Sequence, residues 1–152
     1  MRIAYIDFTL SYNSLDIYIS GCKLPHCEEC HNPELWDFNI GNLWITEKEN
    51  VSYYINSFDS LIDRVMVFGG DVLDSEPTQI ERFLKYIKST GKELWLFTKY
   101  SLEEVPDFVK RYSDYIKTGR YIKGLGVDTN IHYGVKLTTS NQKIYKKGLD
   151  YQ

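Results

Sequence analysis

Short apolar runs alternate with helical patterns along most of the chain, and this alternation constrains the fold more than any other feature. Runs typical of buried strands cover residues 15–20, 65–68 and 93–100. Apolar residues at helical spacing follow them in segments 46–58, 77–90 and 101–112. Such strand and helix units form parallel sheets, because right-handed crossovers place each helix over the preceding strand. We therefore expect a single α/β domain with a mostly parallel sheet.

Capping residues mark where two of the helices begin. Thr46 and Glu49 stand in capping-box relation at the first helix, and Ser101 and Glu104 stand in the same relation at the third. Two more runs, 114–122 and 132–140, are typical of strands. No element is assigned to the polar tail that follows them.

Length and charge exclude several classes of function. The chain of 152 residues has the size of one domain, and its net charge is -3. No basic run exceeds the pair Lys146 and Lys147, so there is little attraction for nucleic acid or an anionic membrane. No apolar stretch approaches the roughly 18 residues of a membrane span, and the N-terminus lacks the apolar core of a signal peptide. We expect a cytoplasmic protein.

All three cysteines lie within the stretch "SGCKLPHCEECHNPELW", residues 20–36. An odd number of closely spaced thiols suits a metal site better than a disulfide framework. Structural zinc and most iron-sulfur clusters use four protein ligands, so Cys22, Cys27 and Cys30 leave one coordination position open. Two alternatives remain at this point: a zinc site completed by His26 or His31, and cysteines buried without a ligand.

Three loops are predicted to meet near these thiols. The cysteine stretch follows the first strand, "GGD" at 69–71 follows the second, and residues 98–100 follow the third. Functional loops of parallel sheets gather at the carboxyl ends of the strands. Gly69 and Gly70 would offer unobstructed backbone groups, and Asp71 would accept a hydrogen bond from an ammonium group. S-adenosylmethionine carries such an ammonium beside a carboxylate.

The cysteine stretch, together with "FGGD", "LFTKY", "TGRYI" and "TTSNQKIY", resembles the activating proteins of anaerobic ribonucleotide reductase. These are small members of the radical S-adenosylmethionine superfamily, and the resemblance spans nearly the whole chain. It implies one radical S-adenosylmethionine domain over residues 1–152, with an incomplete (β/α) barrel-like sheet. It also implies a [4Fe-4S] cluster held by Cys22, Cys27 and Cys30, whose fourth iron binds the amino and carboxylate groups of S-adenosylmethionine.

The resemblance further implies the reaction and its partners. One electron from a flavodoxin- or ferredoxin-type donor would reduce the cluster, and cleavage of the cofactor would give methionine and a 5'-deoxyadenosyl radical. That radical would take a hydrogen from a glycine of the reductase large subunit and leave a glycyl radical. Gly69, Gly70, Asp71 and Asn32 are the expected cofactor-binding residues, and Lys99, Lys117 and Arg120 are further candidates to contact the cofactor carboxylate.

Two departures from the superfamily pattern affect the cysteine loop. "KLPH" places four residues between the first two cysteines where three are usual, so we expect the loop to bulge, with Pro25 as the candidate position. Glu29 replaces the aromatic residue that often precedes the last cysteine, and Trp36 is a candidate substitute for stacking on adenine. The spacing of Cys27 and Cys30 is the usual one.

Two alternative functions remain open from the sequence. The first is another radical S-adenosylmethionine protein, such as an activase for a different glycyl radical enzyme or a 7-carboxy-7-deazaguanine synthase. Those proteins are generally longer, which argues against them. The second is a zinc-stabilised binding module without catalysis. An iron-sulfur protein is brown and a zinc protein is colourless, so colour distinguishes the two classes.

Overall fold

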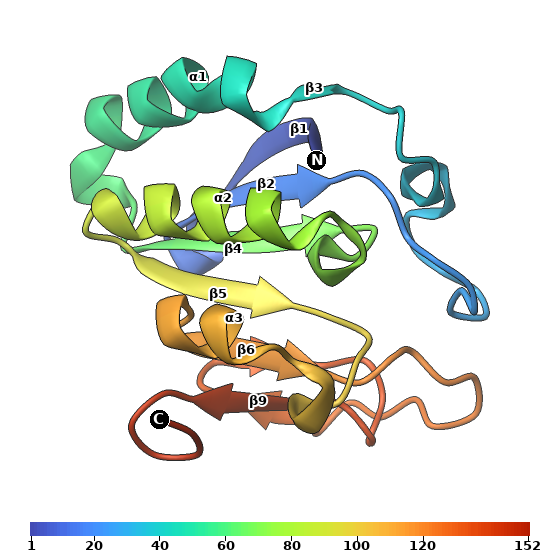
Figure 1. The fold of residues 1–152 in the computed structure, drawn as a ribbon. Helices are drawn as coiled ribbons and strands as arrows, with labels where there is room; N and C mark the ends of the chain where they lie inside the picture. The colour runs from blue at the N-terminus through green and yellow to red at the C-terminus, as the bar shows by residue number, and fades with distance from the viewer.

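A seven-stranded sheet forms the centre of the computed structural model, which describes all residues, 1–152 (Figure 1). The strand order is β3-β1-β2-β4-β5-β6-β9. The strands are β1 (Arg2–Thr9), β2 (Ser14–Ile19), β3 (Asn42–Leu43), β4 (Arg64–Gly69), β5 (Glu93–Phe97), β6 (Tyr115–Thr118) and β9 (Lys143–Lys146). A separate two-stranded hairpin consists of β7 (Ile131–His132) and β8 (Val135–Lys136).

The four central strands run parallel, as the alternation of strand and helix predicted. β2 pairs with β4, β4 with β5, and β5 with β6 in parallel register. The outer pairs differ, because β1 is antiparallel to both β2 and β3, and β9 is antiparallel to β6. The result is a mixed sheet in a single α/β domain. A barrel-like closure is not confirmed, because β3 and β9 are the two ends of an open strand order.

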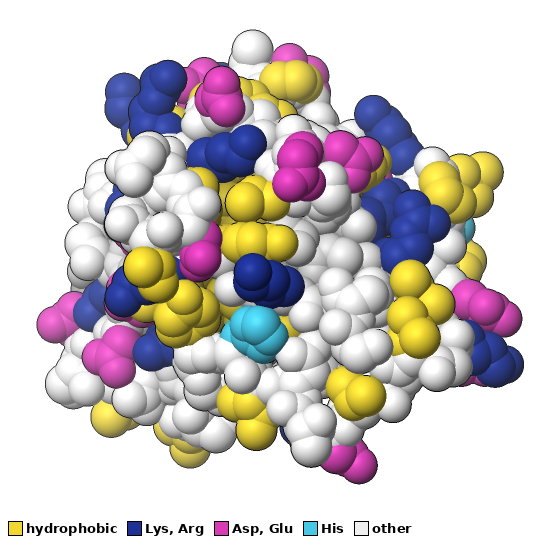
Figure 2. All heavy atoms as spheres, turned by 90° about the horizontal axis from the view of Figure 1, so that it is seen from below, with side chains coloured by type: hydrophobic (Ala, Val, Ile, Leu, Met, Phe, Trp, Pro, Cys, Tyr) yellow, Lys and Arg dark blue, Asp and Glu magenta, His cyan; other side chains and the backbone are white.

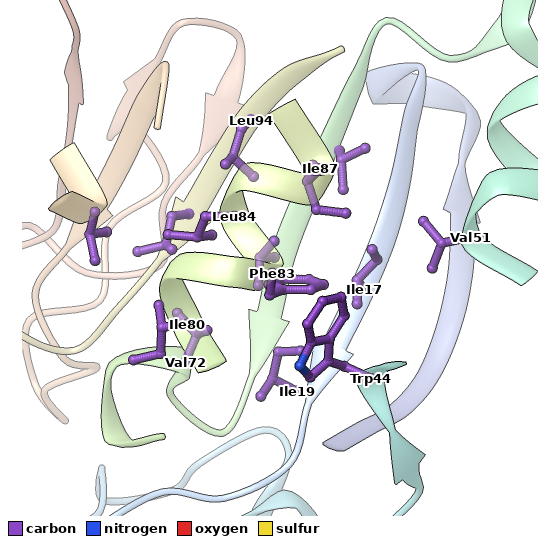
Figure 3. Packing of buried hydrophobic residues seen from close by; sticks show 14 of the residues in the cluster. Ile17, Ile19, Trp44, Val51, Val72, Ile80, Phe83, Leu84, Ile87 and Leu94 are labelled. Atoms are coloured by element: carbon purple, nitrogen blue, oxygen red, sulfur yellow. The ribbon is translucent and has the colours of Figure 1, made fainter. Parts of the chain in front are cut away.

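Three α-helices cover one face of this sheet: α1 (Trp44–Ser57), α2 (Pro77–Ser89) and α3 (Asp107–Tyr112) (Figure 1). The predicted apolar stripe of α2 is fully buried, and it consists of Ile80, Phe83, Leu84 and Ile87. Phe83 meets Trp44 of α1 edge to face, with ring centroids 5.7 Å apart, above Ile17 and Ile19 of β2 (Figure 3). The longest helix, α1, has 14 residues, so no helix reaches the length of a membrane span.

The two predicted capping boxes have different outcomes. α1 begins at Trp44, two residues before Thr46, and the Thr46 hydroxyl donates to the Leu43 carbonyl at 2.7 Å, so the first prediction is wrong. The second box is present, with Ser101 and Glu104 bonded reciprocally. It caps a short 3-10 helix, Leu102–Glu104, because Pro106 separates that turn from α3.

The opposite face of the sheet has a second, smaller core under the hairpin. Met66, Trp95 and Tyr115 alternate with the helix-facing residues of their strands and pack against Val135 and Leu137. The single strand predicted over 132–140 is therefore wrong. Tyr133 and Gly134 have φ of 50° and 80°, and this left-handed pair folds the segment into a hairpin. Figure 2 views the molecule from below Figure 1, where β9 lies. Small groups of basic, acidic and apolar side chains are intermixed on this surface.

Candidate functional site

An open cavity of about 320 Å³ lies at the carboxyl ends of the parallel strands, on the face opposite the helices. Small-molecule sites have volumes of roughly 300–1,000 Å³, so the cavity is large enough for a ligand. Strands β4, β5 and β6 supply its floor through Phe68, Phe97 and Lys117, which share the face of the second core. The cavity therefore lies where the sequence predicted a functional edge.

The three cysteines all line this cavity as free thiols. Cys22 is buried at the start of the loop that follows β2, whereas Cys27 and Cys30 are partly exposed farther along it. Burial raises the pKa of the Cys22 thiol, and a hydrogen bond from Lys99 opposes this effect. The loop contains a cis peptide bond between Leu24 and Pro25, within the insertion that was expected to bulge.

Backbone contacts join the cysteine loop to the end of β4 and the residues that follow it. The Gly21 amide donates to the Leu35 carbonyl at 2.8 Å, and the Asp71 amide donates to the Gly21 carbonyl at 2.8 Å. A Cβ atom on Gly70 would lie 2.2 Å from the Gly21 oxygen, and Gly69 has φ of 121°. Only glycine permits both the close approach and this backbone conformation. Gly69 and Gly70 consequently line the cavity with backbone atoms, beside Cys22.

The side chains around the cysteines do not form a site for a single ion. No group of three or more His, Cys, Asp or Glu side chains is gathered so that it could hold one metal ion. His26 is engaged elsewhere, since its Nε2 lies 2.8 Å from the Cys22 carbonyl and its ring stacks on Trp36. Ligands of one zinc ion all lie about 2.0–2.3 Å from it. Cysteines of an iron-sulfur cluster bind different irons and need only surround a common space.

Asp71 does not line the cavity, although the adjacent glycines do. Its side chain is buried, and its carboxylate accepts hydrogen bonds from the Thr98 hydroxyl at 2.8 Å and from the Lys99 amide at 2.8 Å. The Leu73 amide donates a third bond at 3.1 Å. Burial raises the pKa of Asp71 to about 6. Asp71 thus fixes the ends of β4 and β5 against each other, and its carboxylate faces the protein.

Asn32 and Trp36 line the cavity from the far end of the cysteine loop. Asn32 precedes a short 3-10 helix, Pro33–Trp36, and its side chain makes no capping bond to it. The Trp36 indole N–H is buried without a hydrogen-bond partner. A buried N–H group normally has a partner, so this atom is an unsatisfied donor in a residue that lines the cavity.

Lys117 brings a positive charge to the cavity floor. Its ammonium donates to the Gly119 carbonyl at 2.7 Å and forms no salt bridge with a carboxylate. Burial lowers its pKa to about 8. Lys117 and Arg120 were candidates from the sequence, and both line the cavity. A cation without a protein counter-ion suits an anionic group of a ligand.

Comparison with known proteins identifies a family to which the chain is similar. The model of a family described as a 4Fe-4S single cluster domain matches residues 14–144, from the first residue of β2 into β9. The chain belongs to this 4Fe-4S single cluster family. The match includes all three cysteines and every strand that contributes to the cavity floor.

Curated relatives of this 4Fe-4S family member share one name, anaerobic ribonucleoside-triphosphate reductase-activating protein. The protein of that name from Escherichia coli K12 is 27% identical over 140 residues, which cover 85% of each chain. The one from Salmonella typhimurium is 26% identical over 139 residues, again 85% of each chain. The Vibrio cholerae protein is 26% identical over 117 residues, 70% of this chain and 73% of its own.

Some residues at and beside the cavity were not predicted from the sequence. Thr138 and Gln142 line the cavity from the segment after the hairpin, and the Gln142 amide oxygen accepts bonds from the Thr138 amide at 3.1 Å and hydroxyl at 3.0 Å. Asp74 is buried beside Lys99. The "TTSNQKIY" motif was a signal for Thr138 and Gln142, whereas no sequence pattern distinguishes Asp74 from a loop carboxylate.

Proposed function

We propose that this protein is a radical S-adenosylmethionine activating enzyme that generates a glycyl radical on an anaerobic ribonucleoside-triphosphate reductase. The observation that carries the proposal is a cavity lined by three free cysteines and no fourth. Relatives whose printed names describe activation of that reductase, aligned over up to 85% of the chain, support it. The whole chain, 1–152, would act as one radical S-adenosylmethionine domain in the cytoplasm.

Cys22, Cys27 and Cys30 would hold the [4Fe-4S] cluster, because thiolates are the usual protein ligands of such clusters. When bound and reduced, the cluster supplies the single electron that cleaves S-adenosylmethionine. A flavodoxin- or ferredoxin-type protein would provide that electron. The role of this chain is to bind, orient and protect, as in other cofactor enzymes. The cavity between the cysteine loop and the strand ends suits that role, since it is bounded by backbone on one side and by aromatic rings on the other.

Different residues around the cavity would contact different groups of S-adenosylmethionine. Backbone groups of Gly69 and Gly70 and the Asn32 side chain would contact its amino-acid end, and the Lys117 ammonium would receive its carboxylate. Asp71 would support this site from behind by holding the Thr98 hydroxyl and the Lys99 backbone amide in place. The aromatic side chains of Trp36, Phe68 and Phe97 would exclude water from the remaining space.

The decisive experiment is electron paramagnetic resonance on the anaerobically reconstituted protein mixed with the reductase, S-adenosylmethionine and a reductant. We expect a glycyl radical doublet on the reductase. Glu28→Gln is the matched control, because Glu28 is exposed in the cysteine loop and bonds to nothing there. A doublet on a different glycyl radical enzyme alone would favour another activase. Cofactor cleavage without any protein radical would indicate a small-molecule substrate.

A further inference from the structure

A buried lysine contacts the first cysteine of the site. The Lys99 ammonium lies 3.3 Å from the Cys22 sulfur and 3.0 Å from a carboxylate oxygen of Asp74, and it also donates to the Lys23 carbonyl. The Lys99 and Asp74 side chains are only 5% and 2% exposed. An ammonium has three N–H donors, and here each has one acceptor. One of those three acceptors is a predicted cluster ligand.

Three segments hold this ammonium in place. The Lys99 backbone amide is fixed by Asp71 at 2.8 Å. The Asp74 carboxylate is held in turn by the Tyr100 hydroxyl at 2.5 Å and by the Lys23 amide at 2.7 Å. The pair therefore links the loop after β5, the turn after β4 and the beginning of the cysteine loop. Several hydrogen bonds set its geometry, in addition to the contact with the cysteine.

Stability is a weak reason for placing such a pair in the interior. Burying two charges has a desolvation penalty that their attraction often only offsets, and apolar replacements are frequently as stable. The distinctive feature of this pair is its orientation. The Lys99 ammonium contacts the Cys22 sulfur, whereas the Asp74 carboxylate contacts the ammonium and makes no bond to that sulfur. A fixed charge in a site with little water acts strongly on a neighbouring redox group.

We propose that Lys99 is a positioning residue that raises the reduction potential of the cluster by donating a hydrogen bond to the Cys22 thiolate, with Asp74 limiting the effect of its charge. This inference rests on the proposed function, because it requires a cluster on the cysteines. Reduction adds one negative charge to the cluster. A cation and an N–H donor at a ligand sulfur stabilise that charge, and both are known determinants of cluster potentials.

Opposite substitutions within the pair make the proposal testable. Lys99→Met removes the charge and the donor while retaining most of the side-chain volume, so the midpoint potential should become more negative. Asp74→Asn retains an acceptor for the Lys23 amide and removes the opposing charge, so the potential should become more positive. A tenfold change in the one-electron equilibrium corresponds to 59 mV, and we expect Lys99→Met to reach about that shift. Lys99→Arg retains charge and donors and should lie closest to the wild type.

The measurement is a potentiometric titration of the reduced cluster signal by electron paramagnetic resonance, without S-adenosylmethionine or reductase. Tyr100→Phe is the matched control, because it removes a neutral donor from Asp74 and leaves both charges in place. Its shift should be well below that of Lys99→Met. Iron content is matched between samples, so a loosened loop is distinguished from an altered potential.

Each outcome has a defined meaning. Negative and positive shifts for Lys99→Met and Asp74→Asn support the inference, and equal potentials, or shifts of the same sign, overturn it. If Lys99→Met retains too little cluster to titrate, Asp74→Asn decides alone, since an unchanged potential there overturns the inference. A wild-type protein that binds no iron-sulfur cluster overturns the proposed function as well, whereas loaded proteins of equal potential overturn only the role of Lys99.

Discussion

The two faces of the central sheet differ in composition although the same strands supply both. On the helix side, Val67, Leu96 and Ile116 are fully buried in one apolar core. One position later, on the other side, Phe68, Phe97 and Lys117 line the cavity. Successive side chains of a strand point to opposite faces, so each strand contributes alternately to stability and to chemistry. The comparison shows how a chain of 152 residues accommodates a large core and a site in one layer of strands.

Buried charged residues are also distributed unequally between the two sides of the sheet. Near the cavity, Asp71, Asp74 and Lys99 are buried, and their hydrogen bonds connect the loops that follow β2, β4 and β5. On the helix side, 21 buried hydrophobic residues pack into one continuous cluster. Substitutions on the helix side should therefore act on folding, whereas those on the cavity side should act on ligands first. The predictions below test that difference.

The largest expected effect is complete loss of the cluster. Cys27→Ala or Cys30→Ala removes a thiolate from the cavity side, so the brown colour and bound iron should be lost after anaerobic reconstitution. The unfolding free energy of the apoprotein should change little, because both thiols are partly exposed. Iron analysis and urea denaturation measure the two effects. If a variant that lacks Cys22, Cys27 and Cys30 still binds four irons per chain, the assignment is wrong.

Truncation in the helix-side core should have the next largest effect, and it acts on stability. Phe83 is fully buried between α2 and Trp44, so Phe83→Ala should lower the unfolding free energy by about 3–5 kcal/mol. Phe97→Ala is the matched truncation on the cavity side, where the ring is only partly buried. Its loss should be less than half as large. Urea denaturation of both apoproteins tests this, and equal losses would remove the distinction between the faces.

Loss of the cavity-floor charge should act on cofactor affinity. If Lys117 receives the carboxylate of S-adenosylmethionine, Lys117→Met removes a charge-assisted hydrogen bond of roughly 1.5–3 kcal/mol, or about ten- to a hundred-fold in affinity. Because the pKa of Lys117 is lowered to about 8, wild-type affinity should decrease as pH rises above 8, and the variant should lack this dependence. Anaerobic equilibrium binding at matched iron content measures both quantities.

The matched control for Lys117 is Lys110→Met. Lys110 lies on α3, and its Asp107 partner is exposed, so this substitution removes one positive charge on the helix side. Affinity for S-adenosylmethionine should remain at the wild-type value. An equal loss of affinity in both variants would mean that net charge, and not the position of Lys117, determines binding.

The sequence predicted those elements whose apolar residues follow a regular spacing along the chain. The stripe of α2 and the apolar runs of β2, β4 and β5 follow from periodicity, since each buries a face against the same core. The strand β1 was not predicted, because its outward residues Tyr5 and Asp7 are exposed and its only full neighbour is β2. The pairing of β9 with β6 depends on a long connection through the hairpin, which no local pattern specifies.

The same distinction applies to the site. Adjacent cysteines and glycines were sufficient to predict which loops meet, because parallel strands bring their carboxyl ends together. The bonds of Lys99 to Cys22 and Asp74 join residues 77 and 25 positions apart, and they depend on how the loops pack. Asp71 also illustrates this limit. Its position beside two glycines indicated a ligand contact, whereas its orientation toward Thr98 is set by tertiary structure.

The smallest expected effect concerns the pH dependence of folding at Asp71. Burial raises its pKa to about 6, above the value of 3.8 for an unperturbed aspartate. Between these pH values the folded state retains a proton that the unfolded state has released, so stability should decrease as pH rises from about 4 to about 6. A shift of about two units corresponds to roughly 3 kcal/mol in all, of which about 2 kcal/mol falls between pH 4 and pH 6. Asp71→Asn cannot titrate and should lack this component, although it loses an acceptor for the Lys99 amide and is less stable throughout. Urea denaturation of both apoproteins at several pH values isolates the difference, because all other groups are shared. Parallel stability curves would mean that the folded protein does not raise the pKa of Asp71, and that this buried carboxylate is ionised across this range.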